Sequence, residues 1–370
     1  NPRTGFDGQG RCVPMLGLTC KSLVRNLAPM FDILAELLGE SVFSDGARLK
    51  TLLLEYRAGL ESMIVHNGHR LAMSLAARRF SRARALSEDW GGIHQLKGVK
   101  QRIEGLADER LGGLASALEE LAALIWESSR LQSAVIGEPD VIARAGSHVE
   151  GLLQATRSGG VGSTVETEEG FPGARLREGW STETAVNFVA AGFPTVRLEH
   201  ADSAALAVIA KLLRSLYLHR EIREKGGAYG GFALYNSEDG VFSLASYRDP
   251  HIAATLNVFA GVPDFLRSGR FDENDIKEAI LQVCSEIDKP DPPGPAARKA
   301  FFRRVIGLSD EMRARFKERL IGLTRRDVAA AAEQYFGGSP ADWSVAVIGS
   351  EENLRAANAK LAEPLELHRI

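Results

Sequence analysis

Residues 218–232 read Leu-His-Arg-Glu-Ile-Arg-Glu-Lys-Gly-Gly-Ala-Tyr-Gly-Gly-Phe, and residues 240–250 read Gly-Val-Phe-Ser-Leu-Ala-Ser-Tyr-Arg-Asp-Pro after a short acidic turn. This order predicts a helix, a glycine break, a β-hairpin and a second helix. Between Ala205 and Arg223, apolar residues recur at the spacing of an amphipathic helix. Gly226 and Gly227 are expected to end it, because glycine turns the backbone without a Cβ clash. Tyr229 then begins a strand, so a charged helix end and a tyrosine hydroxyl should lie close together.

The run from Arg223 to Gly230, continued by residues 240–243 and 246–250, resembles the C-terminal half of pitrilysin/insulinase-type zinc metallopeptidases, in the presequence-protease branch. Further matches lie at residues 66–72, 86–97 and 308–311, so the resemblance covers nearly the whole chain. It implies an α+β fold of the LuxS/pitrilysin-like kind. In that fold, two similar domains each pack helices on a mainly antiparallel sheet.

The bulk composition agrees with a globular fold. A chain of 370 residues that is 45% hydrophobic can bury a sizeable core, and its length favours two domains. A formal net charge of -3 offers no electrostatic case for a nucleic-acid partner. No apolar run approaches the roughly 20 residues of a membrane span, so no membrane partner is expected. Cys12, Cys20 and Cys284 fit no disulfide framework and are expected to be reduced core thiols.

The chain is expected to be part of a longer protein, since it opens at Asn1 without a methionine or a signal-like segment. Frequent alanine and arginine, with no targeting segment, favour a bacterial and cytoplasmic protein.

Two similar short segments of the sequence suggest where the domains lie. Residues 133–138, Ser-Ala-Val-Ile-Gly-Glu, return as Val-Ala-Val-Ile-Gly-Ser at residues 345–350, and each copy follows a long helical stretch. We therefore expect residues 1–145 to form an incomplete first domain that ends in a core strand and has lost its opening strand and helix. Residues 146–180 are expected to be a linker, and residues 181–370 a second domain that carries the arginine and tyrosine motif.

Local patterns predict further elements. Helices are expected over residues 22–38, from Asp45 to about residue 63, over residues 68–80 and over residues 108–126. A strand is expected over residues 185–191. Capping residues place four later helix starts at Asp249, Asp272, Ser309 and Thr324, and the proline-rich residues 289–295 predict a stiff loop. Because regular βαβ alternation is absent, the fold class is α+β.

The family's zinc motif is not found in this chain. That motif is His-x-x-Glu-His on a helix, in which two imidazoles bind the metal and the glutamate activates water. The run from His219 to Glu224 lacks the second histidine. His66, His69 and His94 are not expected to bind a metal, because Asn-Gly at residues 67–68 disfavours a regular helix between the first two. Zinc is therefore expected in the full-length enzyme, in an N-terminal half outside this chain.

The resemblance transfers two catalytic residues, Arg223 and Tyr229, and implies that they reach a peptide substrate together with Gly226 and Gly227. Taken alone, these residues allow a plainer interpretation, in which Arg223 pairs with a neighbouring glutamate and Tyr229 packs in a strand. The long match favours the functional interpretation. Arginines 78, 79, 82 and 84 form either a solvated face or a wall that attracts an acidic or C-terminal peptide group.

Three functions compete. The first is the substrate-binding half of a zinc endopeptidase that degrades short, unstructured peptides in a closed chamber. Such a half would be inactive alone, and its partner would be an N-terminal half in the same or a separate chain. The second is a non-catalytic scaffold subunit of the same fold. The third, a nucleotide site at residues 226–231, is weak because those glycines follow a helix and no Lys-Ser/Thr comes after them.

Overall fold

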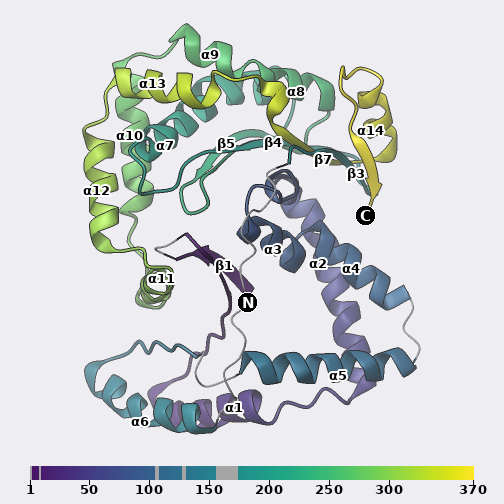
Figure 1. Cartoon of the computed structure of the whole chain (residues 1–370), viewed down its shortest axis with the longest axis vertical. Coiled ribbons are helices and arrows are strands. Elements are labelled where there is room, and N and C mark those ends of the chain that lie inside the picture. The colour runs from purple at the N-terminus through teal and green to yellow at the C-terminus, as the bar shows by residue number, and fades with distance from the viewer. Residues whose placement is uncertain (1, 8–9, 105–107, 127–130, 156–173) are drawn as a thin grey trace.

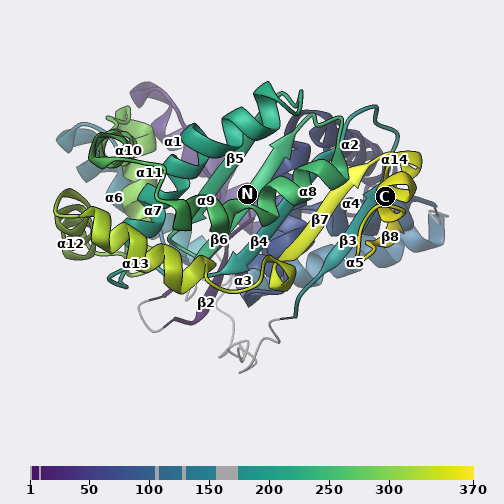
Figure 2. The ribbon, with the colours of Figure 1, turned by 90° about the horizontal axis from the view of Figure 1, so that it is seen from above.

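The computed structural model describes residues 2–7, 10–104, 108–126, 131–155 and 174–370. A six-stranded sheet organises it, in the order β5-β6-β4-β7-β3-β8 (Figures 1 and 2). The strands are β3 (Arg177–Ser181), β4 (Phe188–Pro194), β5 (Gly230–Asn236), β6 (Val241–Tyr247), β7 (Ser344–Gly349) and β8 (Glu366–Arg369). The pairs β5–β6, β6–β4 and β4–β7 are antiparallel, whereas β3 pairs in parallel with both β7 and β8. A separate hairpin joins β1 (Pro2–Phe6) and β2 (Cys12–Leu16).

Helices fill the rest of the chain. Before the sheet come η1 (Val24–Asn26), α1 (Leu27–Gly39), α2 (Gly46–Ala77), α3 (Arg82–Gly91), α4 (Ile93–Glu104), α5 (Asp108–Ile125) and α6 (Pro139–Ala155). Between the strands lie α7 (Ser203–Leu212), η3 (Leu213–Glu224), α8 (Ile252–Ala260), α9 (Val262–Ser268), α10 (Glu273–Ile287), α11 (Pro293–Val305), α12 (Asp310–Ile321), α13 (Arg325–Phe336), η4 (Pro340–Asp342) and α14 (Glu351–Asn358).

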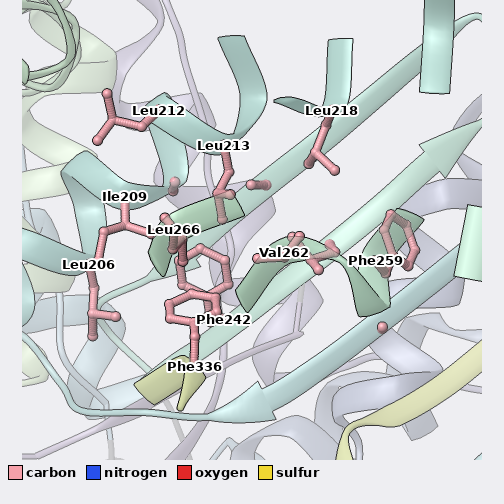
Figure 3. Packing of buried hydrophobic residues seen from close by; sticks show 14 of the residues in the cluster. Leu206, Ile209, Leu212, Leu213, Leu218, Phe242, Phe259, Val262, Leu266 and Phe336 are labelled. Atoms are coloured by element: carbon pink, nitrogen blue, oxygen red, sulfur yellow. The ribbon is translucent and has the colours of Figure 1, made fainter. Parts of the chain in front are cut away.

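The two faces of the sheet are covered by different parts of the chain. Side chains alternate along a strand, so Val189 and Ala191 of β4 join the core beneath α7, whereas Phe188 and Ala190 join a second core beneath α2. We call these sides the α7 face and the α2 face. Leu206, Ile209 and Leu213 pack on the α7 face with Phe242, Leu266 and Phe336 (Figure 3). The prediction of helices packed on a mainly antiparallel sheet is confirmed.

The strand expected at residues 133–138 is not formed, because the described part of that segment has no neighbouring strand. The similar segment at residues 345–350 does contribute to a strand, β7, which lies between β3 and β4 and buries side chains on both faces of the sheet. Strand β3 begins at Arg177, inside the expected linker. Among the described residues before 146, the hairpin is the only sheet, and α2 and α4 pack on the sheet built by later residues. The division into two domains stays a prediction.

Most local predictions agree with the structure. The side chains of Asp45, Asp272, Ser309 and Thr324 cap the helices that follow them. The two helices expected over residues 45–63 and 68–80 are one helix, α2, with non-helical backbone angles at Asn67.

Other predictions were wrong in detail. Asp249 does not cap α8, which begins at Ile252; the buried Asp249 carboxylate accepts hydrogen bonds from the His251 amide (2.8 Å) and the Thr255 hydroxyl (2.7 Å). The strand expected over residues 185–191 is β4, which starts three residues later at Phe188. The proline-rich loop is shorter than expected, because Pro293 already opens α11.

Cys12, Cys20 and Cys284 are free, but the prediction that they lie in the core was wrong, since Cys20 is exposed and the other two are half-buried. Within the described residues, no helix is both long and apolar enough to cross a membrane.

Candidate functional site

The candidate site begins with an unusual helix. α7 passes directly into η3, a π-helix of 12 residues whose Leu218 and Ile222 side chains are buried against the sheet. The amide of Lys225 donates to the carbonyl of Arg220 (3.0 Å), which is the i→i−5 bond of a π-helix. π-helical turns are rare and occur often at functional sites. The wider turn changes the direction in which the last side chains of this helix, including Arg223, project.

The two glycines after η3 meet different requirements. Gly227 has a φ of +74°, a conformation that side chains with a Cβ rarely adopt. A Cβ on Gly226 would lie 2.6 Å from the carbonyl oxygen of Ile222, so no side chain fits there. The amides of Gly227 and Ala228 donate to the carbonyls of Arg223 (3.0 Å) and Ile222 (3.1 Å), closing the helix end. Both glycines therefore position the residues around them, and their expected contact with substrate stays a prediction.

Arg223 and Tyr229 lie together, as the sequence predicted. The guanidinium carbon of Arg223 is 5.9 Å from the centre of the Tyr229 ring, within the range of a cation–π contact. The amide of Tyr229 donates to the carbonyl of Tyr247 (3.0 Å), which fixes the residue just before β5. Tyr229 is nevertheless 66% exposed. A rigid backbone thus presents both a cation and a phenol hydroxyl to solvent.

The plainer interpretation of Arg223 is not realised in the described structure. Glu221 pairs instead with Lys225 and Arg220 (2.9 Å each), and Glu224 lies 3.2 Å from the ring of His219. Hydrogen bonds from Lys225 lower the pKa of the Glu221 carboxyl, so this pair is charged at neutral pH. No ion pair of Arg223 occurs among the described residues, and its charge remains available to a ligand.

His69 is a neighbour that the sequence did not assign to this site. It comes from α2, and its ring stacks on Phe232 (centroids 5.3 Å apart) and meets the edge of Tyr247 (4.9 Å). Tyr247 in turn contacts Tyr229 edge to face (5.7 Å). The Nδ1 atom of His69 is buried without a hydrogen-bond partner in the described residues. Burial, with the nearby charge of Arg70, lowers the pKa of the His69 imidazole and keeps it neutral at physiological pH.

Two arginines of the basic run at residues 78–84 form structural ion pairs. Arg78 forms two hydrogen bonds to the buried carboxylate of Glu178 on β3, one of 2.8 Å from Nη1, and Arg84 pairs with Asp239 in the hairpin turn. The indole of Trp180 also donates to Glu178 (2.9 Å). The expectation of a solvated face was therefore wrong for Arg78 and Arg84, because both side chains link helices to the sheet.

Comparison with known proteins agrees with this geometry. Residues 178–346 match the family described as "PreP C-terminal domain", and residues 3–101 match the family of domains associated with subfamily C of the M16 peptidases. The mitochondrial presequence protease of Danio rerio is 31% identical over 361 residues, which cover 91% of this chain and 35% of that protein. That of Kluyveromyces lactis is 31% identical over 296 residues, or 78% of this chain and 30% of that protein. The chain belongs to the presequence-protease branch of the peptidase M16 family.

Solved structures show the same M16 fold. The crystal structure of pitrilysin aligns with a TM-score of 0.58 at 12% identity, covering 94% of this chain and 36% of that one. A peptidase M16 inactive domain from Pseudomonas fluorescens aligns with a TM-score of 0.58 at 16% identity, covering 93% and 78%. The present M16 chain spans about a third of the length of the curated relatives it matches. It corresponds to their C-terminal part.

M16 peptidases are zinc-dependent, but the described residues of this M16 chain do not fit a zinc ion. They include no group of three or more histidine, cysteine, aspartate or glutamate side chains arranged to hold a metal. The His69 ring packs against Phe232 and Tyr247, and the His94 ring contacts the buried Glu88 carboxylate (3.1 Å). His219 pairs with Glu224 at an exposed helix end.

Proposed function

We propose that this chain is the substrate-binding, C-terminal half of a zinc-dependent endopeptidase that degrades short, unstructured peptides inside a closed chamber. The observation that carries the proposal is the pair formed by Arg223 and Tyr229, held on rigid backbone with free polar groups. Membership of the M16 family gives the reaction class. A scaffold subunit has no use for an exposed cation and phenol in this arrangement.

The two side chains supply different interactions. The Arg223 guanidinium can donate charge-assisted hydrogen bonds to a peptide carbonyl or to a terminal carboxylate. The Tyr229 hydroxyl forms no hydrogen bond within the described structure and can donate to the oxyanion that develops on the attacked carbonyl. Tyr247 contacts the Tyr229 ring edge to face, and His69 in turn packs against Tyr247.

The zinc ion would be bound by an N-terminal half, in the same polypeptide or in a separate chain. There it would supply Lewis-acid activation of water and of the scissile carbonyl. Closing the two halves around a peptide would bring Arg223 and Tyr229 to that peptide and exclude water. The size of the enclosed space would limit substrates to short, unfolded peptides.

The test is cleavage of a quenched fluorescent peptide by the enzyme that contains both halves. We expect Tyr229→Phe to lower kcat by about 10²–10³, the usual cost of losing an oxyanion donor, while the zinc content stays unchanged. Arg223→Ala should raise KM as well, because it removes a contact to bound peptide. Arg220→Ala is the matched control, since Arg220 lies on the same helix end and pairs with Glu221.

Two results would contradict the proposal. Zinc and cleavage in this chain alone would show that the metal assignment is wrong. Full activity in both Arg223→Ala and Tyr229→Phe, or no activity when a zinc-loaded N-terminal half is present, would favour the scaffold function.

A further inference from the structure

Arg248 has a backbone conformation that is unusual for its residue type. It follows Tyr247, the last residue of β6, and its φ is +50°. Among the described residues, it is the only one other than glycine with a positive φ; the others are five glycines, Gly227 and Gly240 among them. A side chain with a Cβ is strained in this left-handed region, and such strain is concentrated at functional sites. Glycine would fit this turn without strain, so an arginine here has an energetic cost.

Buried hydrogen bonds hold the backbone next to Arg248. Asn187 is buried and exchanges two backbone hydrogen bonds with Asp249 (2.8 and 2.9 Å), and its side-chain amide donates to the same Asp249 carbonyl (2.9 Å). On the other side, the carbonyl of Tyr247 accepts from the amide of Tyr229 (3.0 Å). The surrounding structure therefore determines the strained conformation, as is required for backbone strain to persist.

The left-handed turn sets the direction of the Arg248 side chain. Successive residues of an extended strand direct their side chains to opposite faces of the sheet. Tyr247 packs on the α2 face, so an extended Arg248 would point away from it. Instead, the guanidinium carbon of Arg248 lies 5.4 Å from the centre of the Tyr247 ring. The strained backbone thus keeps the arginine beside the tyrosine that contacts Tyr229.

The Arg248 guanidinium is available to a ligand. The residue is exposed, and within the described part of the chain its side chain forms neither an ion pair nor a hydrogen bond. Contacts lead from Arg223 to the Tyr229 ring (5.9 Å), from there to the Tyr247 ring (5.7 Å), and from Tyr247 to Arg248. Two cations that have no acidic partner among the described residues therefore accompany this pair of tyrosines. Their potentials add and favour an anionic group on a bound molecule.

We propose that Arg248 binds a carboxylate of the peptide substrate and makes the site selective for peptides that carry one at this position. A guanidinium can donate two parallel hydrogen bonds to a carboxylate, which gives the contact a defined geometry. The carboxylate belongs either to the C-terminus of the peptide or to an acidic side chain, and both present the same chemistry. This inference rests on the proposed function, because it takes the peptide to lie at Arg223 and Tyr229.

A purely structural role for Arg248 would be to cover the Tyr247 ring at the exit of the hairpin. That role does not require the strain, because the hydrogen bonds between Asn187 and Asp249 already fix the exit. The Tyr247 ring is also packed by His69 (4.9 Å) and by other aromatic rings. What arginine adds at this position is a positive charge and a set of hydrogen-bond donors.

Peptides that differ in one carboxylate test the inference. Labelled, uncleavable peptides are titrated with the 370-residue chain, and fluorescence anisotropy measures their affinity. One pair has a free or an amidated C-terminus, and a second pair has a glutamate or a glutamine within the sequence, so the pair that differs identifies the source of the carboxylate. We expect the carboxylate peptide of that pair to bind about three- to fivefold more tightly at low salt, the size of an exposed ion pair. This gain should shrink as salt is added.

Variants of Arg248 separate its charge from its backbone. Arg248→Gly removes the guanidinium and adopts the left-handed conformation without strain, so it should abolish the preference for the carboxylate without lowering the midpoint of thermal unfolding. Arg248→Lys should retain part of the preference, because it retains the positive charge. Arg220→Ala is the control and should retain all of it, since Arg220 pairs with Glu221. Should Arg248→Gly fail to fold, Arg248→Asn repeats the test, because asparagine tolerates the same backbone conformation.

The outcomes separate the two proposals. If peptide binding is weakened by Arg223→Ala but neither carboxylate improves it, or if Arg248→Gly keeps the preference, the inference is wrong and the proposed function stands. If no peptide binds, both are contradicted. If Arg248→Gly and Arg248→Asn unfold at a lower temperature while the preference is unchanged, Arg248 serves only the fold and the inference is overturned.

Discussion

At the scale of single residues, Gly226 and Gly227 are each required for a different physical reason. Substituting each by alanine can separate the two effects. Gly227→Ala causes no clash with neighbouring atoms, but it places a residue with a Cβ in the left-handed backbone conformation. We expect this to lower the free energy of unfolding by roughly 1–2 kcal/mol. Gly226→Ala places a Cβ 2.6 Å from a backbone oxygen that cannot move without distorting η3. We expect a cost near the upper end of about 1–3 kcal/mol for that change.

The two variants should also differ in activity. Gly226→Ala should displace the end of η3 and with it Arg223, so it should lower peptide cleavage beyond its effect on stability. Gly227→Ala should retain cleavage once the folded fraction is matched. Urea unfolding and steady-state kinetics measure both quantities. Equal loss of activity in the two variants would contradict the view that Gly226 alone determines the path of the helix end.

The sequence could predict that Arg223 and Tyr229 lie close together, because both lie in one local motif, where helix end, glycines and strand follow each other. It could not predict His69 as their neighbour. His69 lies on α2, and only the packing of α2 on the sheet brings its ring between Phe232 and Tyr247. Spacing along the chain carries no signal for such a contact, since it depends on the tertiary fold.

At the scale of elements, strong local patterns predicted the structure and weak ones did not. The hairpin and the capped helices were predictable because turn residues and capping side chains act within a few residues. Residues 133–138 read like a strand, but a strand is stable only beside a partner, and a single sequence does not show whether one is present. The start of β3 inside an expected linker has the same cause, since its partners β7 and β8 come more than 160 residues later.

The joint between α2 and β3 depends on one buried ion pair. Burial opposes ionisation of Glu178, but hydrogen bonds from Arg78 and Trp180 outweigh it and lower the pKa of the Glu178 carboxyl. Arg78→Leu would leave this carboxylate buried without its partner, and we expect a loss of about 3–5 kcal/mol in the free energy of unfolding at neutral pH. Arg355→Leu, which breaks an exposed pair with Glu351, is the matched control and should change little.

The pH dependence of this effect has a definite sign. A carboxyl with a lowered pKa in the folded state stabilises the protein above its unfolded pKa, and this contribution is lost as pH falls through the folded value. In Arg78→Leu the unpaired carboxyl should protonate more easily, so the difference from the parent protein should shrink below about pH 4. Chemical unfolding at several pH values measures it. A difference that stays constant down to about pH 3 would contradict the role assigned to this pair.

At the scale of the whole molecule, one sheet holds together segments far apart in the chain. Residues of α2 and α4 cover one face, and α7 with the later helices covers the other (Figure 1). The two segments matched by the family comparisons, residues 3–101 and 178–346, therefore share a core. The side chains of the candidate site come from both segments, so the site exists only when they are packed together.

A substitution at Gly68 tests this dependence, because α2 packs closely on the Phe188 ring of the sheet at this residue. A Cβ there would lie 2.4 Å from the ring of Phe188, which is fully buried on β4. Gly68→Ala should therefore push α2 from the α2 face, lower the free energy of unfolding by about 1–3 kcal/mol and move His69 away from Phe232 and Tyr247. Gly59→Ala, in the same helix with open space around it, should instead stabilise by about 0.5–1 kcal/mol.

Hydrogen exchange and peptide cleavage together show whether the two segments act as one body. In Gly68→Ala, amides of β4 and of the C-terminal half of α2 should exchange faster in parallel, and cleavage by the two-half enzyme should fall although Arg223 and Tyr229 are unchanged. Gly59→Ala should show neither effect. If exchange rises in α2 alone while cleavage is retained, α2 is only a support on the surface of the sheet, and the site is complete within residues 178–346.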